Sequence, residues 1–215
     1  MGDKMTAIVY EYQRVWAFLK RLLRPILLLL VLFVAVAVAT HFILAAQYRE
    51  DPASMERQMA QLAAMIDSKA LVDESGHLSA SGLFFNNFIA TGMSVVAGVV
   101  PFLFVPLAAL GLNASIMGML SAIMTASGQG GLYELAVSVA PHGVFEIPAL
   151  LLGAAMGCTL CVDISARILY RRRDLPFLAL LSEMTRLSVL VVVPLLAVAA
   201  LLEAYLTPVL MVMLL

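Results

Sequence analysis

Residues 132 to 157 read LYELAVSVAPHGVFEIPALLLGAAMG. His142 and Glu146 stand at the head of a run of about twenty apolar residues, which is long enough to cross a hydrocarbon core roughly 30 Å thick. A carboxylate at the centre of such a helix costs roughly 2.5–3.5 kcal/mol on insertion scales, so it normally has a partner or a function. Because residues four apart lie on one helix face, the two side chains form a predicted polar site within the membrane.

The composition indicates an integral membrane protein. Apolar residues make up 63% of the 215 residues and charged residues 13%, against roughly 45–50% and 25% in ordinary globular domains. Most of the surface must therefore face lipid. The length leaves room for about five spans and no large soluble domain. We expect an all-α polytopic protein of the lipid bilayer, with no nucleic-acid partner.

The two cysteines, Cys158 and Cys161, both lie within one apolar span. This position excludes a disulfide framework, and a zinc site there would need ligands that the neighbourhood lacks. The Cys-x-x-Cys spacing is compatible with a redox pair, although two small buried side chains are the simpler interpretation.

The hydrophobic pattern divides the chain into six segments. The first segment combines a helical apolar repeat with basic and aromatic side chains, which is typical of a helix lying in the headgroup layer. The predicted order is a cytoplasmic interfacial helix at 1–25, a first span at 26–46, an extracytoplasmic loop with an amphipathic helix at 47–82, a core of spans two to four at 83–166, a basic cytoplasmic linker with an amphipathic helix at 167–186, and a fifth span with an apolar tail at 187–215.

Two prolines shape the chain around span four. The piece from residue 132 to residue 140 is too short to cross, so we expect either a surface helix or a re-entrant segment there. Pro141 then restarts the chain. Pro148 should kink span four one turn below Glu146, and the non-helical patch at such a kink often lines a cavity.

Small and amide side chains predict where the spans touch. Gly153 and Gly157 are four residues apart in span four, and Gly118 lies in span three. Glycines at this spacing let helices approach closely, so we expect all three at helix contacts. Asn86 and Asn87, near the outer end of span two, can cap that helix or hydrogen-bond to a neighbouring span.

Basic residues determine the predicted orientation. Five precede the first span, three lie at 47–81 beside six acidic residues, four lie at 167–173, and Arg186 precedes the fifth span. With a cytoplasmic N-terminus, five crossings put ten of the thirteen basic residues in the cytoplasm, as the positive-inside rule requires. The C-terminus is then extracytoplasmic.

Part of this pattern resembles the stage II sporulation protein M family. The most specific element is the segment PHGVFEIPA at residues 141–149, and the asparagines and glycines of spans two and three support it. The resemblance covers residues 83 to 160. The positions that match the family motif are Asn86, Asn87, Asn113, Pro141, His142, Gly143, Glu146 and Pro148.

The resemblance implies a scaffold of the bacterial cytoplasmic membrane. In spore formers the family's namesake recruits or holds cell-wall hydrolases during engulfment of the forespore. We therefore expect a homo-oligomer, with a dimer favoured, and a membrane or cell-wall hydrolase as partner. No residue of the family is established as catalytic.

Three classes of function remain open for the polar site. In a scaffold, His142 and Glu146 satisfy each other or a neighbouring asparagine and fix how the spans pack. In a channel or transporter subunit they line a wet path for a cation or proton. In an intramembrane enzyme they would hold a metal, but a catalytic zinc site needs three protein ligands and no further His or Glu cluster was identified in any span. We therefore expect no enzyme activity, no metal and no cofactor.

Overall fold

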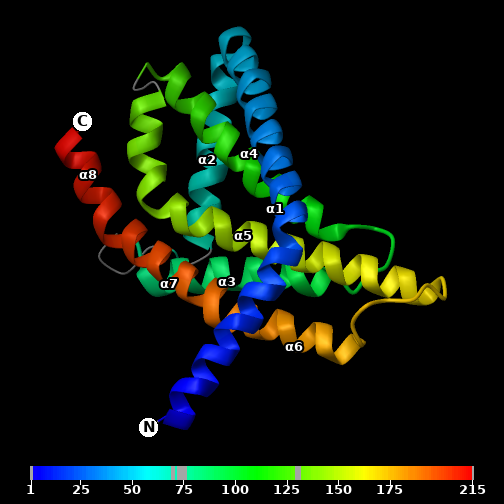
Figure 1. The fold of residues 1–215 in the computed structure, drawn as a ribbon. Coiled ribbons are helices and arrows are strands. Elements are labelled where there is room, and N and C mark those ends of the chain that lie inside the picture. The colour runs from blue at the N-terminus through cyan, green and yellow to red at the C-terminus, as the bar shows by residue number, and fades with distance from the viewer. Residues whose placement is uncertain (1, 69–70, 72–76, 129–131, 215) are drawn as a thin grey trace.

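The computed structural model describes residues 2–68, 71, 77–128 and 132–214. Within these ranges the chain forms helices joined by short connections, as Figure 1 shows. The helices are α1 (Gly2–Glu50), α2 (Pro52–Ser68), α3 (Ala80–Ala97), α4 (Val105–Ala126), α5 (Leu132–Ile168), α6 (Phe177–Leu187), η1 (Ser188–Val192), α7 (Val193–Leu201), η2 (Leu202–Leu206) and α8 (Thr207–Leu214).

Five of the described helical stretches are long and apolar enough to cross a membrane. This number confirms the predicted all-α polytopic fold, and the exposed apolar side chains of these helices fit contact with lipid. The stretches are Val9–Glu50, Ala80–Ala97, Val105–Ala126, Val139–Ile168 and Phe177–Leu210.

The expected break between an interfacial helix at 1–25 and a first span at 26–46 does not occur. α1 continues through Pro25 as one helix of 49 residues. Its N-terminal apolar face does not rest on lipid alone, because Val15, Phe18 and Leu22 are buried in a cluster with side chains of α6. Another helix therefore covers part of this apolar face.

α5 corrects a second expectation. The segment at 132–140 is not a separate helix, since it is the first part of a helix that runs to Ile168. Pro141 and Pro148 both lie inside this helix, and α5 bends in its N-terminal third (Figure 1). A proline inside a helix removes one backbone hydrogen bond and clashes with the preceding turn, so it bends the helix without ending it.

The last span is longer than its predicted limits. The amphipathic helix predicted within 167–186 does not end before the span, because α6, η1, α7, η2 and α8 follow one another and the residues at the first junctions keep helical dihedral angles. Two turns of π-helix, η1 and η2, interrupt this stretch. Such turns carry an extra residue and are frequent at functional sites.

A short loop connects α3 and α4. α3 ends at Ala97, and α4 starts at Val105. Phe102 and Phe104 adopt left-handed conformations in between, with φ of 66° and 45°. The loop is held against the end of α5, because the Phe102 N–H donates to Ser165 Oγ at 3.0 Å.

Glycines bring the spans into backbone contact. A Cβ atom added to Gly157 would lie 2.3 Å from the Ser94 carbonyl oxygen of α3, and one on Gly153 would lie 2.5 Å from Thr91 Cγ2. On α4, a Cβ on Gly118 would lie 2.3 Å from the backbone of α1. All three glycines are therefore at helix contacts, as predicted. Gly153 and Gly157 bring α5 into close contact with α3.

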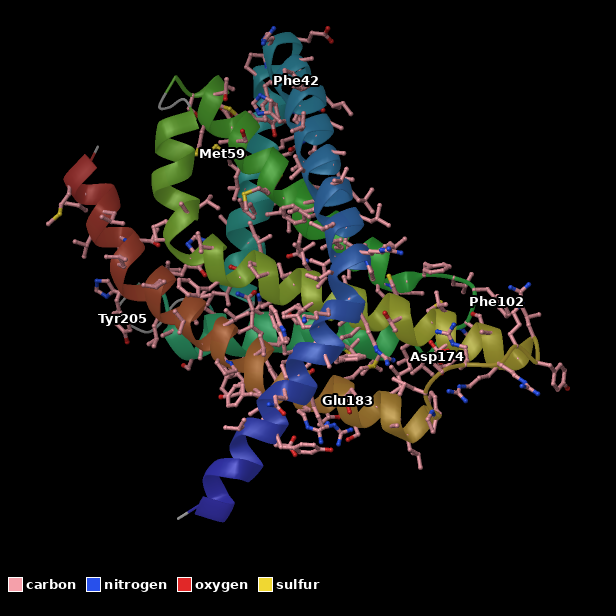
Figure 2. All side chains as sticks on the ribbon, in the orientation of Figure 1. Phe42, Met59, Phe102, Asp174, Glu183 and Tyr205 are labelled. Atoms are coloured by element: carbon pink, nitrogen blue, oxygen red, sulfur yellow. The ribbon has the colours of Figure 1, made fainter. Side chains whose placement is uncertain are left out.

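Ion pairs gather where α1, α5 and α6 meet. Glu183, labelled on α6 in Figure 2, pairs with Arg14 of α1 and with Arg186 one turn along its own helix. At the end of α5, the buried Asp163 accepts from Arg167 Nε at 2.6 Å and from Arg173 Nε at 2.9 Å. Every one of these carboxylates has a guanidinium partner.

Candidate functional site

A cavity of about 200 Å³ lies between α3, α4, α5 and η2. Apolar side chains such as Phe33, Ile116 and Leu150 form part of its wall. Its polar lining consists of Asn86, Asn87, Asn113, His142, Glu146 and Glu203. Five of these six residues were predicted from the sequence, and they come from three different helices.

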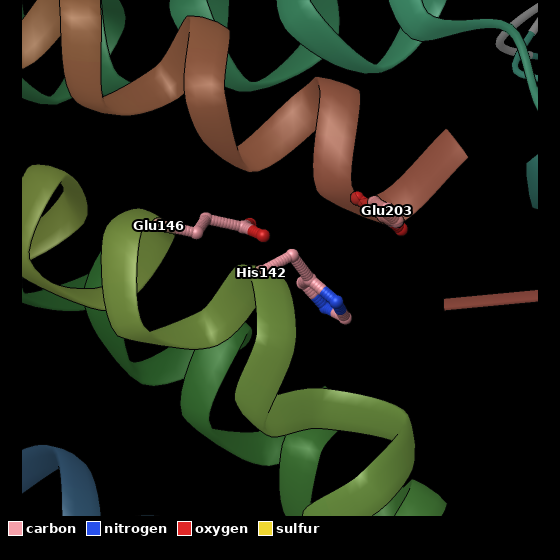
Figure 3. Close-up of side chains that lie close together, drawn as sticks. All are labelled: His142, Glu146 and Glu203. Atoms are coloured by element: carbon pink, nitrogen blue, oxygen red, sulfur yellow. The ribbon is translucent and has the colours of Figure 1, made fainter. Parts of the chain in front are cut away.

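His142 and Glu146 lie one turn apart on α5, as their spacing predicts. Both side chains are half-buried and reach toward the same side of the helix, as Figure 3 shows. Gly143 also lines the cavity. A Cβ atom at this glycine would meet only side chains of α5 itself, the nearest at 3.1 Å.

Pro141 and Pro148 are not lining residues of the cavity. They act on the site through the backbone of α5, in which both are internal. The nitrogen of Pro148 carries no hydrogen, so it cannot donate to the carbonyl oxygen of Val144 one turn earlier. The motif prolines therefore bend and loosen the helix that presents His142 and Glu146.

Glu203 is the residue that the sequence reasoning missed. One ligand atom from each of His142, Glu146 and Glu203 lies within 4.8 Å of the other two. Figure 3 shows Glu203 on the neighbouring helix, facing the side of α5 that carries the other two groups. The sequence analysis looked for a further His or Glu cluster, whereas a single glutamate supplies the third ligand atom here. A lone carboxylate in the apolar last span was the available signal.

Glu203 belongs to the π-helical turn η2, whose bounds are Leu202 and Leu206. The wider turn changes the angular position of the residues that follow relative to those that precede it. The position of this carboxylate therefore depends on a local distortion that hydrophobic periodicity does not reveal.

Thr207 connects the imidazole to the last helix. Its hydroxyl donates to the Leu202 carbonyl oxygen at 3.3 Å, and its oxygen lies 3.4 Å from His142 Nδ1. A hydroxyl has one hydrogen. That hydrogen can point at the carbonyl oxygen or at Nδ1, and the tautomer of His142 decides which group donates across this contact.

The asparagines supply neutral donors and acceptors. Asn86 Nδ2 donates to Asn87 Oδ1 at 3.3 Å, and Asn113 Nδ2 donates to the Ala109 carbonyl oxygen at 3.0 Å. The Oδ1 atoms of Asn86 and Asn113 accept no hydrogen bond from the residues that the structure describes. They remain available to a bound group or to water.

The charge of the site is unbalanced among the described residues. Neither Glu146 nor Glu203 has a hydrogen bond or an ion pair with another described group, and the described lining includes no lysine or arginine. Glu183, Asp163 and Glu11, by contrast, each have an arginine partner. This contrast separates the cavity from the structural ion pairs.

The fold and the site define the class of protein: a multi-pass helical membrane protein whose spans enclose a polar cavity with two carboxylates and an imidazole. The family model for stage II sporulation protein M matches residues 26–208. The chain belongs to this family, and the match extends well beyond the segment that carried the resemblance. No curated protein and no solved structure matches the chain.

Proposed function

We propose that this protein is a channel or transporter subunit that binds a cation in the cavity between α3, α4, α5 and η2. The observation that carries the proposal is the convergence of His142, Glu146 and Glu203 from two different spans. Intramembrane ionisable groups that face a bundle interior commonly mark ion or proton pathways.

A cation accounts for the cost of the site. Two carboxylates without a basic partner in a low-dielectric interior repel each other, and each loses hydration. A bound cation or proton relieves both penalties. If these positions served only to pack the helices, apolar side chains would stabilise the protein more than two carboxylates do. The amide oxygens of Asn86 and Asn113 add neutral ligands of the kind that hard cations accept.

The helices around the cavity have the irregularities that transport sites use. α5 is bent at its prolines, and η2 is a π-helical turn. In many transporters the binding site lies where helices are interrupted, near the middle of the membrane. We propose that the bend of α5 and the π-turn let the cavity open to one side at a time.

The proposed setting is a bacterial cytoplasmic membrane, with the N-terminus in the cytoplasm and the C-terminus outside. The distribution of basic residues supports this orientation. It places the arginines at 171–173 in the cytoplasm. Residues 52–68, which form α2, would then lie at the outer surface.

Reconstitution tests the proposal. Purified protein in liposomes should carry Na⁺, K⁺, H⁺ or a divalent cation down an imposed gradient, and Glu146→Gln and Glu203→Gln should each abolish that flux. Glu56→Gln, an exposed position on α2, is the matched control and should leave flux unchanged. The absence of flux for every cation, or equal flux in all variants, would contradict the proposal.

A membrane scaffold is the second candidate. One observation favours it: Tyr10, Tyr12 and Trp16 expose more than half of their surface on the N-terminal part of α1. Together with the family's namesake, this surface supports recruitment of a cell-envelope partner, such as a cell-wall hydrolase, by a homodimer without enzyme activity of its own.

Glu146 separates the two candidates. A scaffold should tolerate Glu146→Gln, because the amide keeps a hydrogen-bonding group in the cavity, and should lose its assembly with Glu146→Leu. A transport site should lose flux with the Gln variant while its oligomeric mass in detergent stays unchanged. Light scattering on purified protein and flux in liposomes measure the two properties separately.

A further inference from the structure

We propose that the cavity binds a divalent transition-metal ion of the zinc and manganese type through His142, Glu146 and Glu203. This inference rests on the proposed function, in that it names the class of cation that the cavity takes. It goes further because it assigns three ligands and predicts selectivity over alkali and alkaline-earth cations.

The ligand types support a transition metal. Mg²⁺ and Ca²⁺ prefer sites made entirely of oxygen atoms. An imidazole nitrogen combined with carboxylates favours zinc and other first-row transition metals. His142 is the only nitrogen ligand of this type among the described lining residues. Its presence beside Glu146 and Glu203 therefore distinguishes the site from a simple alkali or alkaline-earth site.

The charges support a divalent ion. Two ionised carboxylates and a neutral imidazole carry a net charge of about −2, which a divalent ion neutralises and a monovalent ion leaves half uncompensated. Charge compensation matters here because the cavity lies among membrane-spanning helices, where water contributes little. The described lining offers no lysine or arginine that could supply the positive charge instead.

The distances are compatible with a metal after small side-chain movements. The three ligand atoms lie within 4.8 Å of one another, and zinc–ligand bonds of about 2.0–2.2 Å place tetrahedral ligands roughly 3.5 Å apart. Both glutamates have rotatable side chains and are half-buried at the edge of a cavity of about 200 Å³. Closing the gap requires rotation of these side chains and no change of fold.

The number of ligands suits an ion that exchanges. Structural zinc sites have four protein ligands and are closed, whereas sites with three keep a position open for water or another group. Here the open position faces the cavity, which also holds Asn86 and Asn113. An ion held by three groups from two spans can be released when the spans separate.

Thr207 contacts one ring nitrogen of His142 and leaves the other available to a metal. In the tautomer whose Nδ1–H donates to Thr207 Oγ1, Nε2 would be the ligand atom. Metal-bound histidines usually make such a contact through their other ring nitrogen, which fixes the ring. The threonine lies four residues after Glu203, so one short segment supplies a ligand and positions another.

Metal titration of the full-length protein tests the inference. Chelator-treated protein in detergent is titrated with Co²⁺, whose visible absorption reports nitrogen and carboxylate ligation, and then with Zn²⁺ as a competitor. We expect one ion per chain. His142→Gln and Glu203→Gln should each weaken binding by roughly tenfold or more, while the surface control Glu56→Gln should not change it.

Folding of each variant is checked by its elution profile and its thermal midpoint without metal. The inference is overturned if the wild-type protein binds no Co²⁺ or Zn²⁺, if both variants bind like wild type, or if excess Mg²⁺ or Na⁺ displaces bound Co²⁺ as readily as Zn²⁺ does. If the wild-type protein binds no transition metal but carries Na⁺ or H⁺ in a way that depends on Glu146 and Glu203, this inference is overturned and the proposed function is supported. Metal binding without any flux would support the site and contradict transport.

Discussion

Glu146 of α5 and Glu203 of η2 bring carboxylate oxygens to within 4.8 Å of each other, although they belong to different spans. Two acids this close in a membrane interior are stable only when a proton or a cation lies between or beside them. His142 lies within the same distance of both. The site therefore consists of the α5 motif residues His142 and Glu146 together with Glu203 from a second span.

The neutral hydroxyl of Thr207 should strengthen metal binding at the site through its contact with His142. Thr207→Val removes the hydroxyl that contacts His142 Nδ1 and keeps the shape of the side chain. We expect Zn²⁺ binding to weaken by about tenfold, the lower end of the range for groups that orient a ligand. Competition titration measures the change. Thr185→Val, at an exposed position of α6, should have no effect.

Gly157 should be intolerant of any side chain. Gly157→Ala places a methyl group 2.3 Å from the Ser94 carbonyl oxygen and 2.7 Å from Pro106 Cγ. We expect a loss of about 1–3 kcal/mol, because the backbones of α3 and α5 must move apart. The thermal midpoint in detergent should fall.

The matched control for this substitution is Gly111→Ala on α4. An added Cβ at Gly111 meets nothing within 4 Å, and alanine is favoured over glycine in a helix by up to about 1 kcal/mol. Its thermal midpoint should stay equal or rise. Equal losses in the Gly157 and Gly111 variants would contradict the close contact between α3 and α5.

Asp163 should stabilise the end of α5 through its two arginines. The side chain of Asp163 is only 3% exposed, and Arg167 and Arg173 donate to it. Asp163→Asn should cost about 2 kcal/mol, because a charged acceptor of two charge-assisted hydrogen bonds is lost while both guanidinium groups remain. Asp51→Asn breaks the exposed pair with Arg57 and should cost less than about 1 kcal/mol. Thermal midpoints that fall equally would argue against this ranking.

α1 should be one straight helix in solution. Spin labels at Tyr12→Cys and Phe42→Cys, both exposed, in a background without Cys158 and Cys161, should give a distance distribution centred near 45 Å, since a helix rises about 1.5 Å per residue. Pulsed electron paramagnetic resonance measures this distance. A much shorter distance would show that the helix breaks near Pro25 and that the first segment lies separately on the membrane.

Much of the fold could be predicted because the local pattern and the global fold agree. The apolar runs are long enough to identify five spans, and the spacing of His142 and Glu146 fixed their common helix face. Asn86, Asn87 and Asn113 could be assigned to the same site only through the family resemblance. Their meeting in one cavity required the packing of α3 and α4 against α5.

The errors have a common physical origin. An amphipathic pattern shows that one face of a helix is apolar, but it does not show whether lipid or protein covers that face. Here α6 covers Val15, Phe18 and Leu22 of α1. Boundaries were expected after residue 25 and at Pro141, yet Pro25 and Pro141 lie inside helices. Glu203 has no partner at helical spacing, so only the tertiary fold and the η2 turn reveal its role.

Cross-linking of Glu146→Cys with Glu203→Cys in native membranes, in a background with Cys158 and Cys161 replaced by alanine, tests the shared site most directly. A short thiol cross-linker or Cd²⁺ should join the two spans efficiently, because the native ligand atoms lie within 4.8 Å. The control pair, Val144→Cys with Glu203→Cys, uses a position of α5 that is 64% exposed and should react poorly. Failure of the first pair, or equal reaction of both, would contradict a site completed by Glu203.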